Sequence, residues 1–108
     1  MNFLAPVGIG DMESSVAQII ADQLGQRTLY MIGASRLVGA KNSLMFKVGR
    51  NANKVTHLRI TLDPSDTYTV EALAIRGISI VTKGKATDVY VDSLHRTIES
   101  LTGLRTRL

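Results

Sequence analysis

Hydrophobic residues stand at alternate, even-numbered positions through much of the second half of the chain. The alternation runs through residues 44–48, 58–62, 68–74 and 78–80. A period of two is typical of β-strands that bury one face and expose the other. Because paired strands must turn these even residues to the same side, the pattern predicts an antiparallel β-meander.

The turns between these strands predict the register of the meander. Residues 63–67 read DPSDT, a composition that suits a hairpin loop, so that Leu62 is expected to face Tyr68. By the same rule Ala74 is expected to face Ile78 across residues 75–77, where Gly77 supplies a left-handed conformation. Both turns are consistent with a single buried face of even-numbered residues.

Hydrophobic residues at three- and four-residue steps predict one helix on each side of the meander. The first covers about residues 12–24, with Asp11 as its N-cap and Gly25 at its end. The second covers about residues 88–102; Thr87 is expected as its N-cap, and Gly103 follows its last residue.

Two further segments lie between the first helix and the meander. Residues 28–32 are rich in β-forming side chains and predict a short strand, and residues 33–42 predict an irregular loop. The expected fold class is therefore α+β, with an antiparallel meander of four to five strands. An N-terminal and a C-terminal helix would cover one face in a two-layer sandwich. Residues 12–108 are expected to form a single domain, with residues 1–11 as an N-terminal extension.

Composition narrows the chemistry more than it identifies it. The chain has 108 residues, 44% of them hydrophobic and 20% charged, which is ordinary for a globular domain. The absence of cysteine excludes a disulfide framework, a thiolate zinc site and a cysteine nucleophile, and it fits a reducing cytoplasm. The first ten residues lack the basic leader of a signal peptide, and no later segment has the hydrophobic length of a membrane span.

Charge is distributed unevenly, and this is the main functional lead. From Gln23 to Leu62 there is no Asp or Glu, although the stretch holds seven basic residues. Arg59 is expected to pair with Glu71 across the sheet, and Arg27 adjoins a helix end. The remaining cations predict a site for a partner rich in negative charge, such as nucleic acid: Arg36, Lys41, Lys47, Arg50 and Lys54.

Catalysis finds little support in the residues. His57 and His95 fall on different elements with no third ligand at metal spacing, so no metal site and no nucleophile with its base are predicted. Asp63 and Asp66 are better explained by turn chemistry than as a catalytic carboxylate pair. Gly8 and Gly10 lack the rest of a nucleotide-binding fingerprint. The protein is therefore expected to be no enzyme and to need no cofactor.

The odd-numbered face of the sheet leads to a different hypothesis. Leu73, Ile75 and Val81 would alternate onto the face away from the helices and form an apolar patch. Such a patch predicts a protein interface, which a host protein or a second copy of the chain could occupy. Alternatively, apolar residues of the N-terminal extension would cover it: Phe3, Leu4, Val7 and Ile9.

Several segments of the chain resemble a family of small proteins found widely in phages and prophages. The similarity is carried by NSLMFKVGRNANKVTHLRITLDPSDTYTVEALAIRG, by the preceding LYMIGASRLVGAKN, by QIIADQLG and by the closing TGLRTRL, over about residues 17–108. It implies a mobile-element protein in the cytoplasm of a bacterial host, and it implies no particular activity. Together these observations predict a non-catalytic accessory binding protein of a phage or prophage. Nucleic acid is the first candidate partner and a host or defence protein the alternative.

Overall fold

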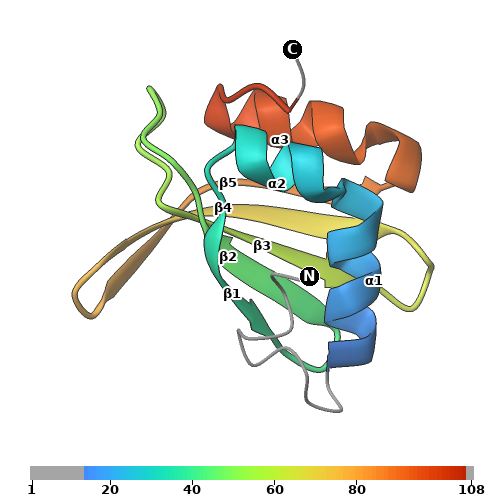
Figure 1. Ribbon diagram of the computed structural model, residues 1–108. Coiled ribbons are helices and arrows are strands. Elements are labelled where there is room, and N and C mark those ends of the chain that lie inside the picture. Colours follow the sequence, from blue (N-terminus) through green and yellow to red (C-terminus); the bar gives the residue numbers. More distant parts are fainter. Residues whose placement is uncertain (1–13, 107–108) are drawn as a thin grey trace.

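A five-stranded antiparallel sheet forms one layer of the molecule and three helices form the other (Figure 1). The structure is a computed structural model and describes residues 14–106. The strands follow one another in space as in sequence, β1-β2-β3-β4-β5. The predicted α+β meander with helices on one face is therefore confirmed, whereas the extension at residues 1–11 and the N-cap Asp11 lie outside the described residues.

The first helix, α1 (Ser14–Leu24), buries a stripe at helical spacing: Ala17, Ile20, Ala21 and Leu24. Gly25, with φ of +86°, ends it, and a second short helix, α2 (Gln26–Met31), begins at once. The strand predicted over residues 28–32 is therefore wrong. Leu29 and Ile32 are buried three residues apart while Tyr30 is exposed, and this spacing fits a helical turn instead of a strand.

The predicted loop at residues 33–42 contains the edge strand β1 (Ser35–Gly39), so that prediction is also wrong. Its pairing with β2 (Ser43–Lys47) shifts between Ser35 and Val38, where Arg36 adopts φ of +54°. Of the β1 residues only Leu37 is buried, because the strand lies at the sheet edge and is interrupted by this bulge. One buried side chain leaves no alternation to recognise.

The centre of the sheet follows the predicted register. In β3 (His57–Leu62) and β4 (Tyr68–Arg76), Leu62 pairs with Tyr68 and Ile60 with Val70. The connecting loop closes as turn chemistry requires, with the Asp63 N–H donating to the Thr67 carbonyl at 2.9 Å. The even-numbered residues of β2 and β3, together with those of β4 as far as Ala72, join the α1 stripe and Leu94 and Ile98 of the last helix in one core.

The β4–β5 connection differs from the prediction. β5 (Ser79–Val89) pairs with β4 through Arg76 opposite Ser79, so the turn contains only Gly77 and Ile78. Gly77 has φ of +61°, and a left-handed Gly in the first of two turn positions is a favoured hairpin arrangement. The change from a three-residue to a two-residue turn moves Ile78 and Ile80 out of the buried set, and both are exposed.

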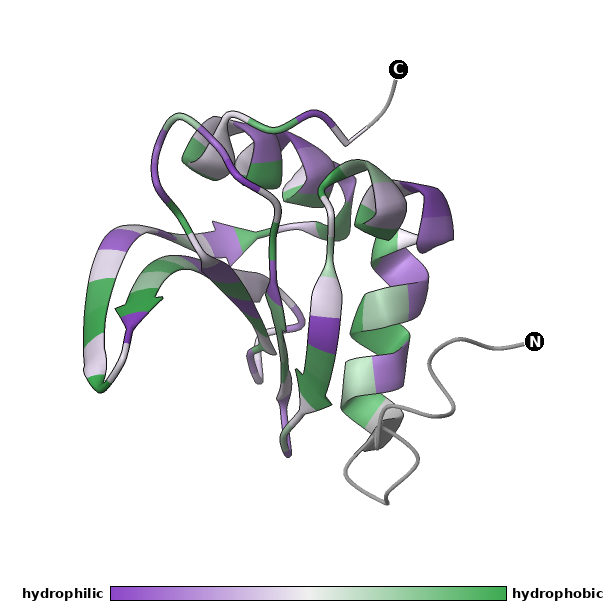
Figure 2. Cartoon of the chain, turned by 60° about the vertical axis from the view of Figure 1, so that its left-hand side comes forward, coloured by the Kyte–Doolittle hydropathy of each residue, from purple (hydrophilic) through white to green (hydrophobic). Residues whose placement is uncertain are grey.

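The last helix begins later than predicted. Asp88 and Val89 belong to β5, and Val89 is buried opposite Tyr68, so Thr87 is not an N-cap. A 3₁₀ turn, η2 (Val91–Ser93), then leads into α3 (Leu94–Thr102), which ends at Gly103 in the predicted left-handed conformation. The sheet thus extends at one end beyond the helices that cover its centre, and the β4–β5 hairpin projects from it (Figures 1 and 2).

Candidate functional site

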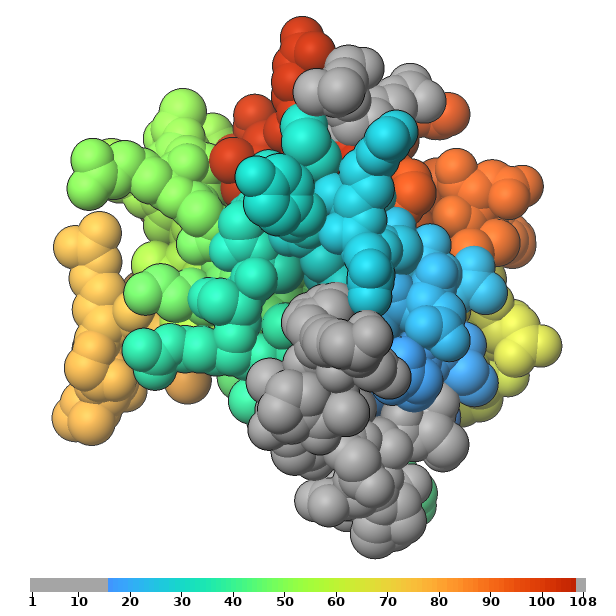
Figure 3. Space-filling view, viewed as in Figure 1, coloured from blue at the N-terminus to red at the C-terminus, as the bar shows by residue number. Residues whose placement is uncertain are grey.

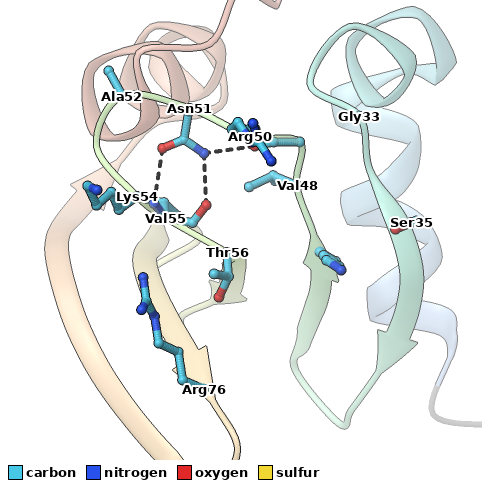
Figure 4. A pocket seen from close by; sticks show the side chains of 12 residues that line it. Gly33, Ser35, Val48, Arg50, Asn51, Ala52, Lys54, Val55, Thr56 and Arg76 are labelled. Carbon is cyan, nitrogen blue, oxygen red and sulfur yellow. Dashed lines mark hydrogen bonds between the residues drawn. The ribbon is translucent and has the colours of Figure 1, made fainter.

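A wide groove lies at the end of the sheet, between the loop that joins β2 to β3 and the end of β4 (Figure 4). Its volume is about 960 Å³. Three of the predicted cations, Lys47, Arg50 and Lys54, line it together with Arg76. These residues come from β2, from the loop and from β4, so the fold brings together charges that are far apart in sequence.

The other two predicted cations are placed differently. Arg36 lies at the bulge of β1, near enough to His57 that its charge helps to lower the pKa of that imidazole. Lys41 lies in the β1–β2 connection beside Asn42, whose carbonyl accepts the N–H of Leu62 at 2.8 Å. That connection is at the opposite end of the strands from the groove, so Lys41 does not belong to the cluster.

Asn51 holds the β2–β3 loop in shape. Its Nδ2 donates to the carbonyls of Gly49 and Val55, each at 2.8 Å, and its Oδ1 accepts the Val55 N–H at 3.0 Å. The Asn51 carbonyl also accepts the N–H of Lys54, which has φ of +59°. Figure 4 shows the side-chain bonds crossing the loop between Arg50 and Lys54. One side chain therefore fixes the backbone that presents both cations.

The same loop is attached to two other parts of the molecule. The Gly49 N–H donates to the Ile32 carbonyl at 2.9 Å, and Asn53 Nδ2 donates to the Leu101 carbonyl at 2.9 Å. A Cβ on Gly33 would lie 3.1 Å from the Gly49 Cα, so the two backbones pack closely at this point. Attachment at both sides limits the freedom of the loop, so the backbone that carries the cations needs little ordering before they bind.

A second, smaller hollow continues the groove along the β4–β5 hairpin. It has a volume of about 190 Å³ and shares Lys54 and Arg76 with the first, and it adds Lys83. In Figure 3 the 50–55 loop and the hairpin project on the same side of the molecule. Neither Arg76 nor Lys83 was among the predicted site residues. The sequence did contain a signal that could have identified both residues, because residues 72–87 include no Asp or Glu.

Among residues 14–106 no carboxylate lines either hollow. Glu71 is engaged on the sheet, where it accepts Arg59 Nε at 2.8 Å and Arg59 Nη2 at 3.1 Å, as the cross-strand register predicts. The Arg59 hydrogen bonds lower the pKa of the Glu71 carboxyl. The other acids of the described chain are Asp22, Asp63, Asp66, Asp88, Asp92 and Glu99. Within residues 14–106, no carboxylate therefore balances the positive charge of the groove.

His57 lies beside the groove on β3, opposite Lys47 as predicted. Burial lowers the pKa of its imidazole, and the charges of Lys47 and Arg36 lower it further. Its Nδ1 lies 2.8 Å from Thr56 Oγ1, which also accepts the Ile75 N–H at 2.8 Å. The hydroxyl of Thr56, which lines the groove, thus connects the groove to the base of the β4–β5 hairpin.

The predicted apolar trio does not form one patch. Leu73 is only 2% exposed, and the β4–β5 register pairs Ala74 with Val81, which places Val81 on the opposite face from Ile75. The prediction was wrong because the shorter turn reverses the facing of the first β5 residues. The apolar residues that are exposed here are instead Ile78, Ile80 and Val81.

The second histidine has a packing role. His95 Nε2 on α3 donates to the Leu24 carbonyl at 3.1 Å, which joins α3 to the end of α1. Within the described part of the chain, no group of three or more His, Asp or Glu side chains could hold a metal ion.

Comparison of the chain with protein-family models, with curated proteins and with solved structures gives no match. Over the residues that the structure describes, no helix combines the length and apolar character needed to cross a membrane.

Proposed function

We propose that this protein binds the phosphate backbone of a nucleic acid through the basic groove and performs no catalysis. Four cations converge on one hollow that no described carboxylate enters, and this observation carries the proposal. Each cation held near a phosphate adds attraction and releases condensed counterions. The resemblance to phage and prophage proteins supports a setting in the cytoplasm of a bacterial host, where the protein would act as an accessory factor.

The side chains that line the groove favour contact with a phosphate backbone over stacking against bases. Its lining contains Lys, Arg, Asn, Thr and Ser side chains and no aromatic residue. Single-strand binding platforms depend on aromatic side chains on which bases stack. Phosphate contacts from basic and hydroxyl side chains are instead the common means of positioning a protein on a duplex.

A salt titration of binding tests the proposal. The groove variant Lys54→Gln with Arg76→Gln is compared with the control Lys41→Gln with Arg96→Gln, which removes the same charge from exposed positions outside the groove. The slope of log K against log salt is negative for binding to phosphates. We expect its magnitude to be smaller by about 2 in the groove variant, since each phosphate contact contributes about 0.9. The control should keep the wild-type slope. Equal losses in both variants would show that only net charge matters.

A second candidate function, protein binding, is favoured by the exposed apolar side chains of the hairpin, Ile78, Ile80 and Val81. Exposed apolar groups clustered on one element are typical of an interface with a second protein or a second copy. Sedimentation velocity distinguishes the two functions. Nucleic-acid binding by the groove needs no self-association, so concentration-dependent association that is lost in Ile80→Ser would favour the protein interface, and a monomer at all concentrations would leave a homo-oligomeric interface without support.

A further inference from the structure

The β4–β5 hairpin projects beyond the helices and carries a large apolar side chain at its tip. The turn residue Ile78 has a relative exposure of 102%, and no residue of the described chain covers it. Turn positions usually hold Gly, Pro, Asn, Asp or Ser, because these residues suit the backbone conformation of a turn or hydrogen-bond to it, and a large aliphatic side chain such as Ile78 has no such use there. Figure 2 shows hydrophobic segments near the end of this hairpin, away from the helical layer.

The charges along the hairpin complement a polyanion. Residues 72–87 contain no acid, and of their three cations Arg76 and Lys83 belong to the projecting hairpin, whereas Lys85 lies opposite Glu71 on the sheet. Arg76 stands two residues before the tip, and Lys83 lines the hollow that continues the groove. The tip therefore presents Ile78 just beyond Arg76, with Lys83 further along the other strand of the hairpin.

The hairpin is anchored firmly at its base. The Thr56 N–H donates to the Leu73 carbonyl at 2.8 Å, and the Ile75 N–H donates to Thr56 Oγ1 at 2.8 Å. From Leu73 to Arg76, the end of β4, the strand extends by roughly 10 Å, at about 3.3 Å per residue, and the turn carries Ile78 beyond that point. The minor groove of B-form DNA is about 7.5 Å deep, so an arm of this length reaches its floor while its base stays outside.

We propose that the β4–β5 hairpin enters the minor groove of double-stranded DNA and wedges Ile78 between base pairs, while the basic groove holds the adjoining backbone. The proposal rests on the proposed function and names its ligand as duplex DNA. Minor-groove proteins commonly insert an apolar wedge such as Ile into a base step, which unstacks the step and bends the duplex.

An anionic membrane would also attract a basic, apolar hairpin, but the placement of the side chains favours the duplex. Ile75 and Ile80 share one face of the hairpin, and Val81 lies on the other. Insertion into a lipid surface needs several apolar groups on one side. Ile78 stands alone at the turn, and the other exposed apolar residues, Ile80 and Val81, are divided between the two faces of β5 behind it, an arrangement that suits a narrow gap between stacked bases better than a flat lipid surface.

Bending and unstacking of DNA test the wedge separately from binding. A short duplex carries a fluorophore at each end for energy transfer and a central 2-aminopurine that brightens when unstacked. We expect the wild-type protein to increase energy transfer and 2-aminopurine fluorescence. The Ile78→Ser variant should lose at least about half of both signals, with a loss of affinity below about tenfold. The Ile78→Leu variant should retain both signals, and Tyr30→Ser, at another exposed position, should match the wild type.

Other outcomes overturn the wedge in distinguishable ways. Tight binding without bending or unstacking overturns the wedge and leaves the proposed function standing, as does a bend that Ile78→Ser preserves. Stronger binding to vesicles containing phosphatidylserine than to the duplex, lost in Ile78→Ser, overturns DNA in favour of a membrane. Equal unstacking of duplex RNA of the same sequence overturns the assignment to DNA. Absence of any salt-dependent binding overturns the proposed function together with the wedge.

Discussion

The strand β4 passes through two different environments on the same face of the sheet. Val70 and Ala72 lie under the helices and have no exposed surface. Ala74, two residues further, is partly exposed, and Arg76 is exposed at the groove. The alternation of side chains continues unchanged while the cover ends. The proposed site therefore forms where the sheet extends beyond its helical layer.

Polar groups are treated differently in these two regions. In the described chain no buried side-chain nitrogen or oxygen lacks a hydrogen-bond partner, so the polar groups of the covered region are satisfied within the protein. At the exposed end, burial and then the charges of Lys47 and Arg36 lower the pKa of His57, and no carboxylate of the described chain enters the groove to balance these charges. A polyanion would supply the missing charge.

The largest effect should come from truncating the covered region. Phe46 is fully buried in the core, and Phe46→Ala should destabilise the protein by about 3–5 kcal/mol through lost burial and a residual cavity. Ile78→Ala, at the fully exposed tip, should change stability by no more than about 0.5 kcal/mol. Urea denaturation followed by circular dichroism measures both. Similar losses for the two variants would contradict the division of the sheet into covered and exposed regions.

An intermediate effect is expected at the boundary between the regions. Asn51→Ala removes three side-chain hydrogen bonds of 2.8 to 3.0 Å within the loop and should cost about 1–3 kcal/mol of stability. Because the loop presents Arg50 and Lys54, nucleic-acid affinity should fall as well, although no charge is removed. Anisotropy titration and urea denaturation give the two quantities.

Asn53→Ala is the matched control for that variant. It removes the single bond from Asn53 to the Leu101 carbonyl and leaves the internal bonds of the loop in place. We expect a smaller loss of stability, about 0.5–1.5 kcal/mol, and a smaller loss of affinity. An Asn51→Ala variant that binds as tightly as the wild type would show that the groove does not depend on a preformed loop.

The centre of the fold was predictable because several sequence signals agreed there. Leu62 and Tyr68 flank a loop whose Pro and Asp residues are typical of a turn, and the alternation in the two strands allows only one register between them. The β4–β5 turn was ambiguous, since Gly77 satisfies a left-handed position either as the third of three turn residues or as the first of two. Periodicity could not decide between them, because Ile75, Ile78 and Ile80 are all hydrophobic.

The site was predictable in part for the same reason. Lys47, Arg50 and Lys54 are close in sequence, so their convergence needed only a strand end and a loop. Arg76 reaches the groove through the register of β4, and Lys83 through a bulge between Leu73 and Ala72 that the alternation does not show. Lys41 was included because residues 33–42 were expected to be one loop, whereas β1 separates Lys41 from the groove.

Contacts distant in sequence were beyond local signals. The bond from Asn53 to Leu101 joins residues 48 apart, and the close approach of Leu101 to Gly84 depends on how α3 crosses β5. A Cβ on Gly84 would lie 2.8 Å from Leu101 Cδ2, so packing explains this glycine where turn chemistry does not. Such pairings follow from the whole fold and not from any one segment.

The smallest expected effect is a pH dependence that reports on the exposed region alone. The pKa of His57 in the folded protein lies below 6.5, its ordinary value in the unfolded chain, because of burial and the charges of Lys47 and Arg36. As pH falls below about 6.5, the unfolded chain therefore binds the proton more readily and stability declines.

A bound phosphate backbone would offset the neighbouring cations and raise the pKa of His57, so affinity should increase as pH falls through the same window. The increase should stay below about tenfold per pH unit, the limit for one titrating group. His57→Gln should flatten this part of both profiles, as measured by urea denaturation and by anisotropy at constant ionic strength. If the affinity of His57→Gln instead shows the same pH profile as the wild type, the bound phosphates lie away from Lys47 and His57, at the hairpin side of the groove.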